Sequence, residues 1–78
     1  KSTILIGISK EGTIYMENRI IDIRSVRANV EKLLAENPES GVIVVADKKS
    51  QTGVSVNVID QCRLAGAKGV SIAAKVDD

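Results

Sequence analysis

Residues 42–46, VIVVA, are apolar at every position, and this run constrains the fold more than any other part of the chain. A short, continuous apolar run is typical of a strand that is covered on both faces. Longer segments with helical spacing of apolar residues lie before and after it. We therefore expect helices packed on a sheet that contains this strand.

The segment before this strand is predicted to be an amphipathic helix that starts after Asp22. Asp22 is a favourable N-cap, because its carboxylate accepts a backbone N–H and lies at the positive end of the helix dipole. Asn37-Pro38 ends the helix, since the residue before a proline disfavours helical dihedral angles. The apolar face of this helix consists of Ile23, Val26, Val30, Leu33 and Leu34.

The segment after the strand predicts a second amphipathic helix, over about residues 53–65. Ser50 or Thr52 is the expected N-cap, and Gly66 is well placed to end the helix. The apolar face of this helix consists of Val54, Val58, Cys62 and Ala65, with Val56 and Ile59 beside them.

The first part of the chain predicts a β-hairpin. Residues 3–9, TILIGIS, place isoleucine at every second position, which is the period of a strand. Lys10-Glu11-Gly12 is a turn signal, and Gly12 can adopt a positive φ at low cost. Residues 13–17 form the second strand, and Ile20-Ile21 adds a short extended piece.

Residues 69–74, GVSIAA, are predicted to be the last strand. The expected order is therefore β-β-α-β-α-β, and the closing βαβ unit should be parallel and right-handed. Each helix has one apolar face, so both helices can pack on one face of a single mixed sheet. The sequence predicts a two-layer α+β sandwich, with residues 1–78 as one domain.

Composition excludes several functions. The 78 residues carry a net charge of +1 from scattered charges, and Tyr15 is the only aromatic residue, so a nucleic-acid interface is not expected. Without histidine and with a single cysteine, the usual metal ligands are missing. No stretch approaches the roughly 20 apolar residues that cross a bilayer. The chain begins at Lys1 rather than Met, which suggests a processed product or an excised fragment.

Asp47-Lys48-Lys49 directly follows the apolar strand, where ligands bind in many open α/β sheets. One interpretation is a catalytic carboxylate or a phosphate-binding lysine, with a small-ligand site over Asp47–Gly53. However, this linker has one glycine and lacks the glycine-rich cradle that phosphate binding uses. We favour the interpretation in which Asp47 binds local backbone donors and the lysines stay solvated.

Catalysis is not expected elsewhere in the chain either. The serines have no histidine to act as their base. Cys62 lies on the apolar face of its helix, which favours a buried and inert thiol. Asp60 and Arg63 share an i, i+3 spacing on the outer side of that helix, as a surface ion pair. We therefore predict a protein without catalytic residues, cofactor or metal.

The face of the sheet opposite the helices is predicted to be exposed and partly apolar. It should contain Leu5 and Tyr15, with either Val42/Val44 or Ile43/Val45, depending on register. An exposed apolar surface of this kind marks an interaction site in many proteins. Self-association and partner binding are the two expected uses of this face.

Several segments in order resemble the periplasmic domain of the ExbD/TolR family. They are ISKEGTIYMENRIID, LLAENPES, VIVVADK, VIDQCRLAG and AKGVSIAA. The most telling pieces are Ala46-Asp47-Lys48 after the third strand, Asp60 in the second helix and Ala65-Gly66 before the last strand. The chain departs from the family at Thr52, where a tyrosine is usual, and at Cys62, where a larger aliphatic residue is usual.

The resemblance implies a function in energy transduction. Members have one transmembrane helix, with an aspartate that senses the proton gradient, inside a ring of ExbB/TolQ-type subunits. The periplasmic domain tends to dimerise and acts with TonB- or TolA-type partners, and TolR-type domains are linked to peptidoglycan. On this basis we predict a non-enzymatic, periplasmic interaction domain of an inner-membrane protein. The alternative is a regulatory domain that binds a small ligand at Asp47–Gly53.

The residues selected as candidates for partner binding combine the exposed face with the family landmarks. They are Leu5, Tyr15, Ile43, Val45, Asp47, Lys48 and Asp60.

Overall fold

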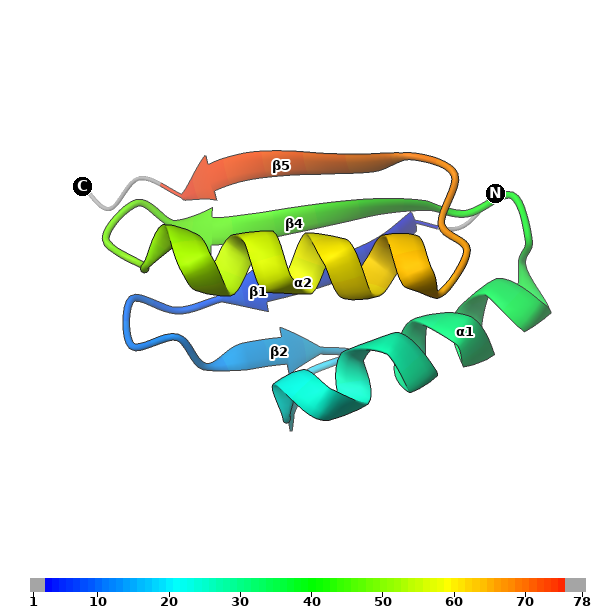
Figure 1. Cartoon of the computed structure of the whole chain (residues 1–78), viewed down its shortest axis with the longest axis horizontal. Helices are drawn as coiled ribbons and strands as arrows, with labels where there is room; N and C mark the ends of the chain where they lie inside the picture. Colours follow the sequence, from blue (N-terminus) through cyan, green and yellow to red (C-terminus); the bar gives the residue numbers. More distant parts are fainter. Residues whose placement is uncertain (1–2, 76–78) are drawn as a thin grey trace.

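The computed structural model describes residues 3–75, which form one mixed five-stranded sheet and two α-helices (Figure 1). The sheet order is β3-β2-β1-β4-β5, antiparallel across β3, β2 and β1 and parallel across β1, β4 and β5. The predicted two-layer α+β fold is therefore confirmed. The elements are β1 (Thr3–Ile8), β2 (Ile14–Met16), β3 (Arg19–Ile21), the 3-10 helix η1 (Ile23–Ser25), α1 (Val26–Glu36), β4 (Gly41–Asp47), α2 (Thr52–Leu64) and β5 (Val70–Lys75).

Two tight turns build the antiparallel part of the sheet. Gly12 has φ 88° in the turn between β1 and β2, as the sequence predicts. The turn between β2 and β3 places Glu17 and Asn18 at φ 52° and 62°. This conformation suits asparagine but is unfavourable for glutamate. The short extended piece predicted at Ile20-Ile21 is thus part of a true strand, β3.

The first helical segment begins and ends where the sequence predicts. Asp22 is the N-cap of η1, and its Oδ1 accepts a hydrogen bond from the backbone N–H of Arg24 at 2.8 Å. The chain continues from η1 into α1, which ends at Glu36. Asn37 is the C-cap, and its N–H donates to the carbonyl of Leu33. The proline that follows prevents a further turn.

The expected N-cap of the second helix was wrong. Gln51 holds this position in α2, and its side chain makes no capping hydrogen bond. Ser50 is not available, because its Oγ donates to the carbonyl of Asp47 at 2.7 Å. Thr52 is already the first helical residue. Gly66 has φ 102° directly after the C-cap, so its predicted role at the end of the helix is confirmed.

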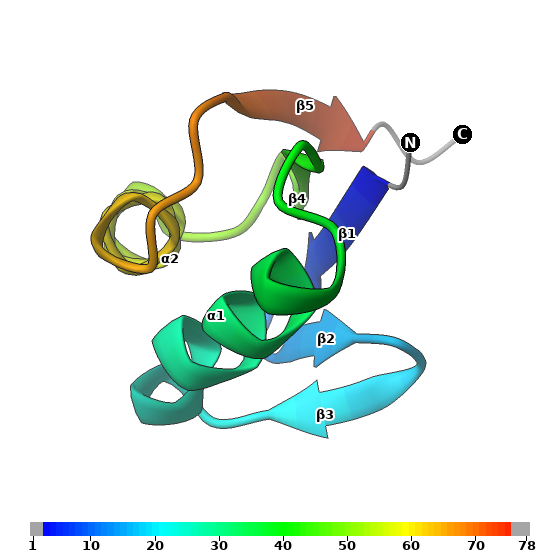
Figure 2. The same ribbon diagram turned by 90° about the vertical axis from the view of Figure 1, so that its right-hand side faces the viewer.

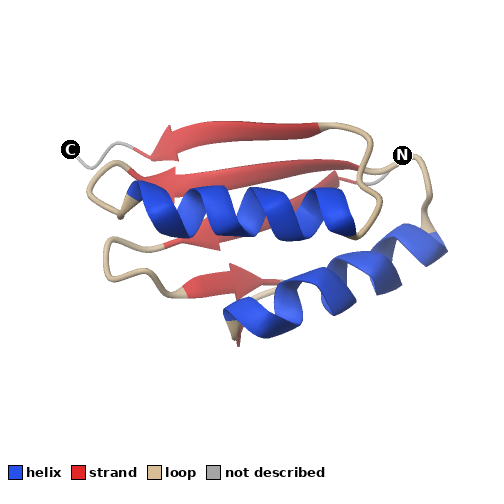
Figure 3. Cartoon of the chain, viewed as in Figure 1, coloured by secondary structure: helices blue, strands red, loops and turns tan. Residues whose placement is uncertain are grey.

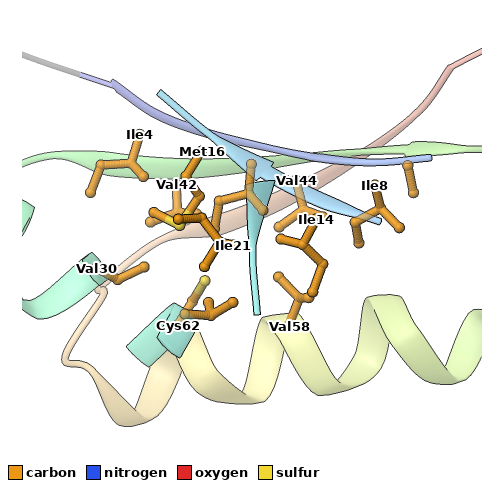
Figure 4. Close-up of a cluster of buried hydrophobic side chains, with 13 residues drawn as sticks. Ile4, Ile8, Ile14, Met16, Ile21, Val30, Val42, Val44, Val58 and Cys62 are labelled. Carbon is orange, nitrogen blue, oxygen red and sulfur yellow. The ribbon is translucent and has the colours of Figure 1, made fainter. Parts of the chain in front are cut away.

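Both helices lie on the same side of the sheet, as the helices (blue) and strands (red) in Figure 3 and the turned view in Figure 2 show. Their apolar faces and the helix-facing side of the sheet form one core (Figure 4). Aliphatic side chains dominate this core. Its members are Ile4, Ile6, Ile8, Ile14, Met16, Ile21, Val26, Val30, Val42, Val44, Ala46, Val58 and Cys62.

The strand at residues 42–46 belongs to β4, which lies inside the sheet between β1 and β5, but it is covered on one face only. Val42, Val44 and Ala46 are buried under the helices, whereas Ile43 and Val45 are half-buried on the opposite face. The expectation that both faces are covered was therefore wrong. In an isolated chain with helices on one side, alternate residues of this strand have no second layer to pack against.

Candidate interaction surface

The register of β4 decides which residues form the exposed face of the sheet. Val42 and Val44 point into the core, so Ile43 and Val45 point to the side without helices. Of the two alternatives that the sequence left open, the structure selects Ile43/Val45.

Four of the candidate residues gather on this open face. Leu5 of β1 is the neighbour of Ile43 on β4, and Gly7 lies between Tyr15 on β2 and Val45 on β4. Leu5 is 58% exposed, and Tyr15 is exposed as well. Because Gly7 has no side chain, it leaves a hollow between its two neighbours, inside a shallow pocket of about 390 Å³. The open face is thus an apolar surface with a depression toward the end where β1 and β4 finish, and Lys10, Glu11, Asp47 and Lys75 also line this depression.

Ile20 extends the open face, although the sequence analysis did not select it. It pairs with Tyr15 across β2 and β3 and is 71% exposed. A signal was present in the sequence, because the adjacent Ile20 and Ile21 must point to opposite faces of a strand. Only one of them, Ile21, enters the core.

The second exposed feature is β5, the strand at one edge of the sheet. Five of its six residues are exposed, and no helix lies in front of it in Figure 1. Ile72 is 58% exposed although it points to the helix side, because α2 lies over the strands next to β5. The sequence analysis did not select this strand, whose small residues Ser71, Ala73 and Ala74 gave little sign of its place at the edge.

The outer edge of β5 carries backbone groups that point away from the sheet. The N–H of Val42 donates to the carbonyl of Gly69, and the N–H of Lys48 donates to the carbonyl of Lys75. In a parallel ladder alternate residues bond to the same neighbour, so Val70, Ile72 and Ala74 direct their N–H and C=O groups outward. The opposite edge strand, β3, has three residues and offers a shorter template.

Asp47 and Lys48 lie at the end of β4 and form a local turn. The Oδ1 atom of Asp47 accepts a hydrogen bond from the backbone N–H of Lys49 at 2.8 Å. The backbone N–H of Ser50 donates to the carbonyl of Asp47 at 2.8 Å. Lys48 and Lys49 are both exposed. The favoured interpretation of this motif, a carboxylate that binds local donors beside solvated lysines, is confirmed.

Asp60 does not join the other candidates. It is exposed on α2, in the helical layer, whereas Leu5 and Tyr15 lie on the opposite face of the sheet. The ion pairs within residues 3–75 involve other side chains, so the pair expected between Asp60 and Arg63 is absent there.

The shifted ionisable groups have local causes. The guanidinium of Arg24 donates a hydrogen bond to Asp22 and, together with its backbone N–H, lowers the pKa of that carboxyl. Burial raises the pKa of the Cys62 thiol. Among residues 3–75, no three Cys, Asp or Glu side chains lie close enough together to hold a metal ion. Neither described helix is long and apolar enough to cross a bilayer.

The sequence is also similar to known proteins. The family model described as "Biopolymer transport protein ExbD/TolR" matches residues 1–76. The chain is also similar to biopolymer transport protein exbD2 of Vibrio cholerae serotype O1, with 32% identity over 72 residues. The match covers 92% of this chain and 54% of that protein, so the chain spans about half the length of this relative.

Proposed function

Because the chain belongs to the ExbD/TolR family of biopolymer transport proteins, we propose that residues 1–78 form the periplasmic domain of an inner-membrane protein that transduces the proton-motive force. In this proposal the domain is a non-enzymatic interaction module. The full-length protein is anchored beside ExbB/TolQ-type subunits, and the domain contacts a TonB- or TolA-type protein. Family membership supports the assignment, and the exposed surfaces of the sheet support the mode of action.

The outer edge of β5 is the observation that carries the proposed mode of binding. An extended segment can add to an open sheet edge, with main-chain hydrogen bonds providing affinity and side-chain pockets providing specificity. Val70, Ile72 and Ala74 present outward N–H and C=O groups along this edge. Charged side chains on an edge strand usually prevent another chain from pairing with it. In β5 the first charged side chain is Lys75 at the end, so little opposes pairing along this edge.

The open face is a separate surface, which we assign to self-association. Leu5, Tyr15 and Ile43 lie on neighbouring strands there, with Ile20 at the margin. A second copy that packs against this face would cover its exposed apolar side chains. The β5 edge would stay accessible in such a dimer, so a homodimer could bind an extended partner at the same time.

The edge proposal predicts that Ala74→Pro strongly weakens partner binding. Ala74 is exposed and directs its N–H outward, so Ala74→Pro removes one donor of the free edge and leaves the β4–β5 ladder intact. The measurement is a nuclear magnetic resonance titration of the labelled domain with synthetic peptides that tile the periplasmic region of the TonB- or TolA-type protein from the same organism. We expect shifts along β5 in the unchanged protein and at least a tenfold loss of affinity in the variant, or about 1.4 kcal/mol.

Ala74→Ser is the matched control, because it keeps the outward N–H and should bind as the unchanged protein does. Thermal unfolding of both variants shows whether the sheet is intact. Binding that survives Ala74→Pro would rule out strand addition at β5. Shifts only with peptidoglycan fragments, and none with any peptide, would assign the domain to the cell wall instead.

A further inference from the structure

The outward backbone groups of β5 determine which way the side chains of an added strand point. Val70, Ile72 and Ala74 direct their N–H and C=O groups away from β4, and their side chains lie on the helix side, because their register partners on β4 are buried under the helices. In an antiparallel pair, a residue that exchanges both hydrogen bonds with Ile72 lies directly opposite it and has its side chain on the same face. Every second side chain of such a segment therefore lies on the helix side.

The helix side of β5 has space for such side chains. Ile72 lies on this side but is 58% exposed, because α2 covers the strands next to β5 (Figure 1). A pocket of about 440 Å³ lies between β5 and the first turns of α2. Ala46, Ile72 and Ala74 contribute apolar groups to its wall, and Thr52 and Ser55 of α2 contribute polar groups. Because the side chain of Ala74 is small, the pocket can take a larger aliphatic side chain from an adjacent strand.

The end of the sheet where β4 and β5 finish has an excess of positive charge. Lys48 and Lys49 follow β4, Lys75 ends β5, and all three are exposed. The Oδ1 atom of Asp47 accepts from a backbone N–H, and within residues 3–75 no ion pair joins this carboxylate to a lysine. The turn between β1 and β2 adds one lysine and one glutamate, which balance each other. An acidic side chain of a bound segment is therefore favourable at this end.

We propose that the β5 edge selects an extended segment of a partner protein that pairs antiparallel and has an acidic residue followed by aliphatic residues at every second position. The acidic residue lies opposite Lys75, on the open face. The aliphatic residues lie opposite Ala74, Ile72 and Val70, on the helix side, where the first fills the pocket and the second covers Ile72. Antiparallel pairing is slightly more stable per residue than parallel pairing. This selectivity rests on the proposed strand addition at β5.

The test is a nuclear magnetic resonance titration of the labelled domain with the acetylated, amidated hexapeptide Asp-Ile-Thr-Ile-Thr-Ile. In the antiparallel register its second residue lies opposite Ala74 and its fourth opposite Ile72. N-methylation of the fourth residue removes a donor to β5 and should lower the affinity by a factor of about ten or more. N-methylation of the third residue, whose N–H points away from β5, should change the affinity by less than about twofold. The reverse order, or equal effects at both positions, would overturn the proposed pattern.

Two variants of β5 test which face receives the aliphatic side chains. A hexapeptide with alanine as its second residue should bind the unchanged domain about fivefold more weakly, because it buries less apolar surface in the pocket. Ala74→Leu fills the pocket and should abolish this preference for isoleucine. Ala73→Leu adds the same side chain on the open face, so the preference should remain. A preference that survives Ala74→Leu would overturn the assignment of the pocket.

The acidic position has its own test. Lys75→Gln should weaken binding of the hexapeptide by a factor of about two to five, the effect of one exposed charge pair. Lys68→Gln, at the other end of β5, should leave binding unchanged, and equal effects of the two changes would refute the charge pairing. Absence of β5 shifts with every peptide would refute strand addition itself. Shifts of the β5 amides on concentrating the domain alone would assign the edge to a second copy of this chain and overturn the proposal.

Discussion

Cys62 is the residue whose environment the sequence described most completely. Its place on the apolar face of α2 indicated a buried thiol, and the side chain is 0% exposed. Burial also raises the pKa of the thiol above its usual value of 9.0, because the thiolate is poorly solvated there. The thiolate is the reactive form, so both access and ionisation protect this cysteine.

Labelling of Cys62 with a thiol reagent should therefore report unfolding. At pH 8 we expect the folded domain to react more slowly than the urea-unfolded chain by a factor of about 10³ or more, the ratio that a stability of about 5 kcal/mol gives. Absorbance of the released reagent measures the rate. Because the pKa of the Cys62 thiol is higher in the folded domain than in the unfolded chain, the free energy of unfolding should fall as the pH rises above the pKa of the unfolded chain's thiol. Fast labelling of the folded protein would show that α2 opens locally.

For the candidate site residues, the sequence predicted local hydrogen bonding better than it predicted which face of the fold each residue occupies. Asp47 forms the local turn that its type and position indicated, and Leu5 and Tyr15 share the exposed face. Asp60 was placed with them only through the family resemblance, and a resemblance carries no information about which face of the fold a residue occupies.

At the level of elements, both α-helices and four of the five strands were predictable from the spacing or continuity of their apolar residues, whereas β3 was predicted only as a short extended piece and is missing from the expected order β-β-α-β-α-β. The N-cap of α2 was not predictable, because the Ser50 hydroxyl could either cap the helix or donate to the carbonyl of Asp47, and in the structure it donates to Asp47. The exposure of β5 was not predictable either. It depends on where α2 crosses the sheet, and this is set by packing between elements rather than by the residues of β5.

Two glycines should respond in opposite ways to the same substitution. Gly12 has φ 88°, so Gly12→Ala should destabilise the hairpin turn by about 1–2 kcal/mol. Gly53 lies in the first turn of α2, with no atom within 4 Å of the position a Cβ would take. Gly53→Ala should stabilise the domain by about 0.4–1 kcal/mol, because alanine restricts the unfolded chain. Chemical denaturation of both variants gives the two signs, and equal signs would contradict the turn assignment.

In the whole molecule, the two faces of the sheet have different roles. The face under the helices forms the core, and the open face is the proposed dimer contact. Leu5 and Ile6 are neighbours in β1, but Ile6 is buried in the core and Leu5 is exposed on the open face. Ile6→Ala should reduce the free energy of unfolding by about 2–5 kcal/mol.

The proposed homodimer should respond to Leu5 instead. Leu5→Lys should change the stability of the monomer by less than about 0.5 kcal/mol, because the side chain is at the surface. The same change places a charge in the proposed dimer contact and should shift sedimentation velocity profiles to the monomer. A dimer that persists in this variant would mean that the open face is not the contact.

The parallel arrangement of β1, β4 and β5 has a mechanical consequence. The start of β1 and the end of β5 lie at opposite ends of the 35 Å long axis of the molecule (Figure 1). Tension between these two points therefore acts along the strands and loads the β1–β4 and β4–β5 ladders in shear. Many hydrogen bonds must then break together rather than one after another. The domain should therefore resist extension when force is applied between the start of β1 and the end of β5.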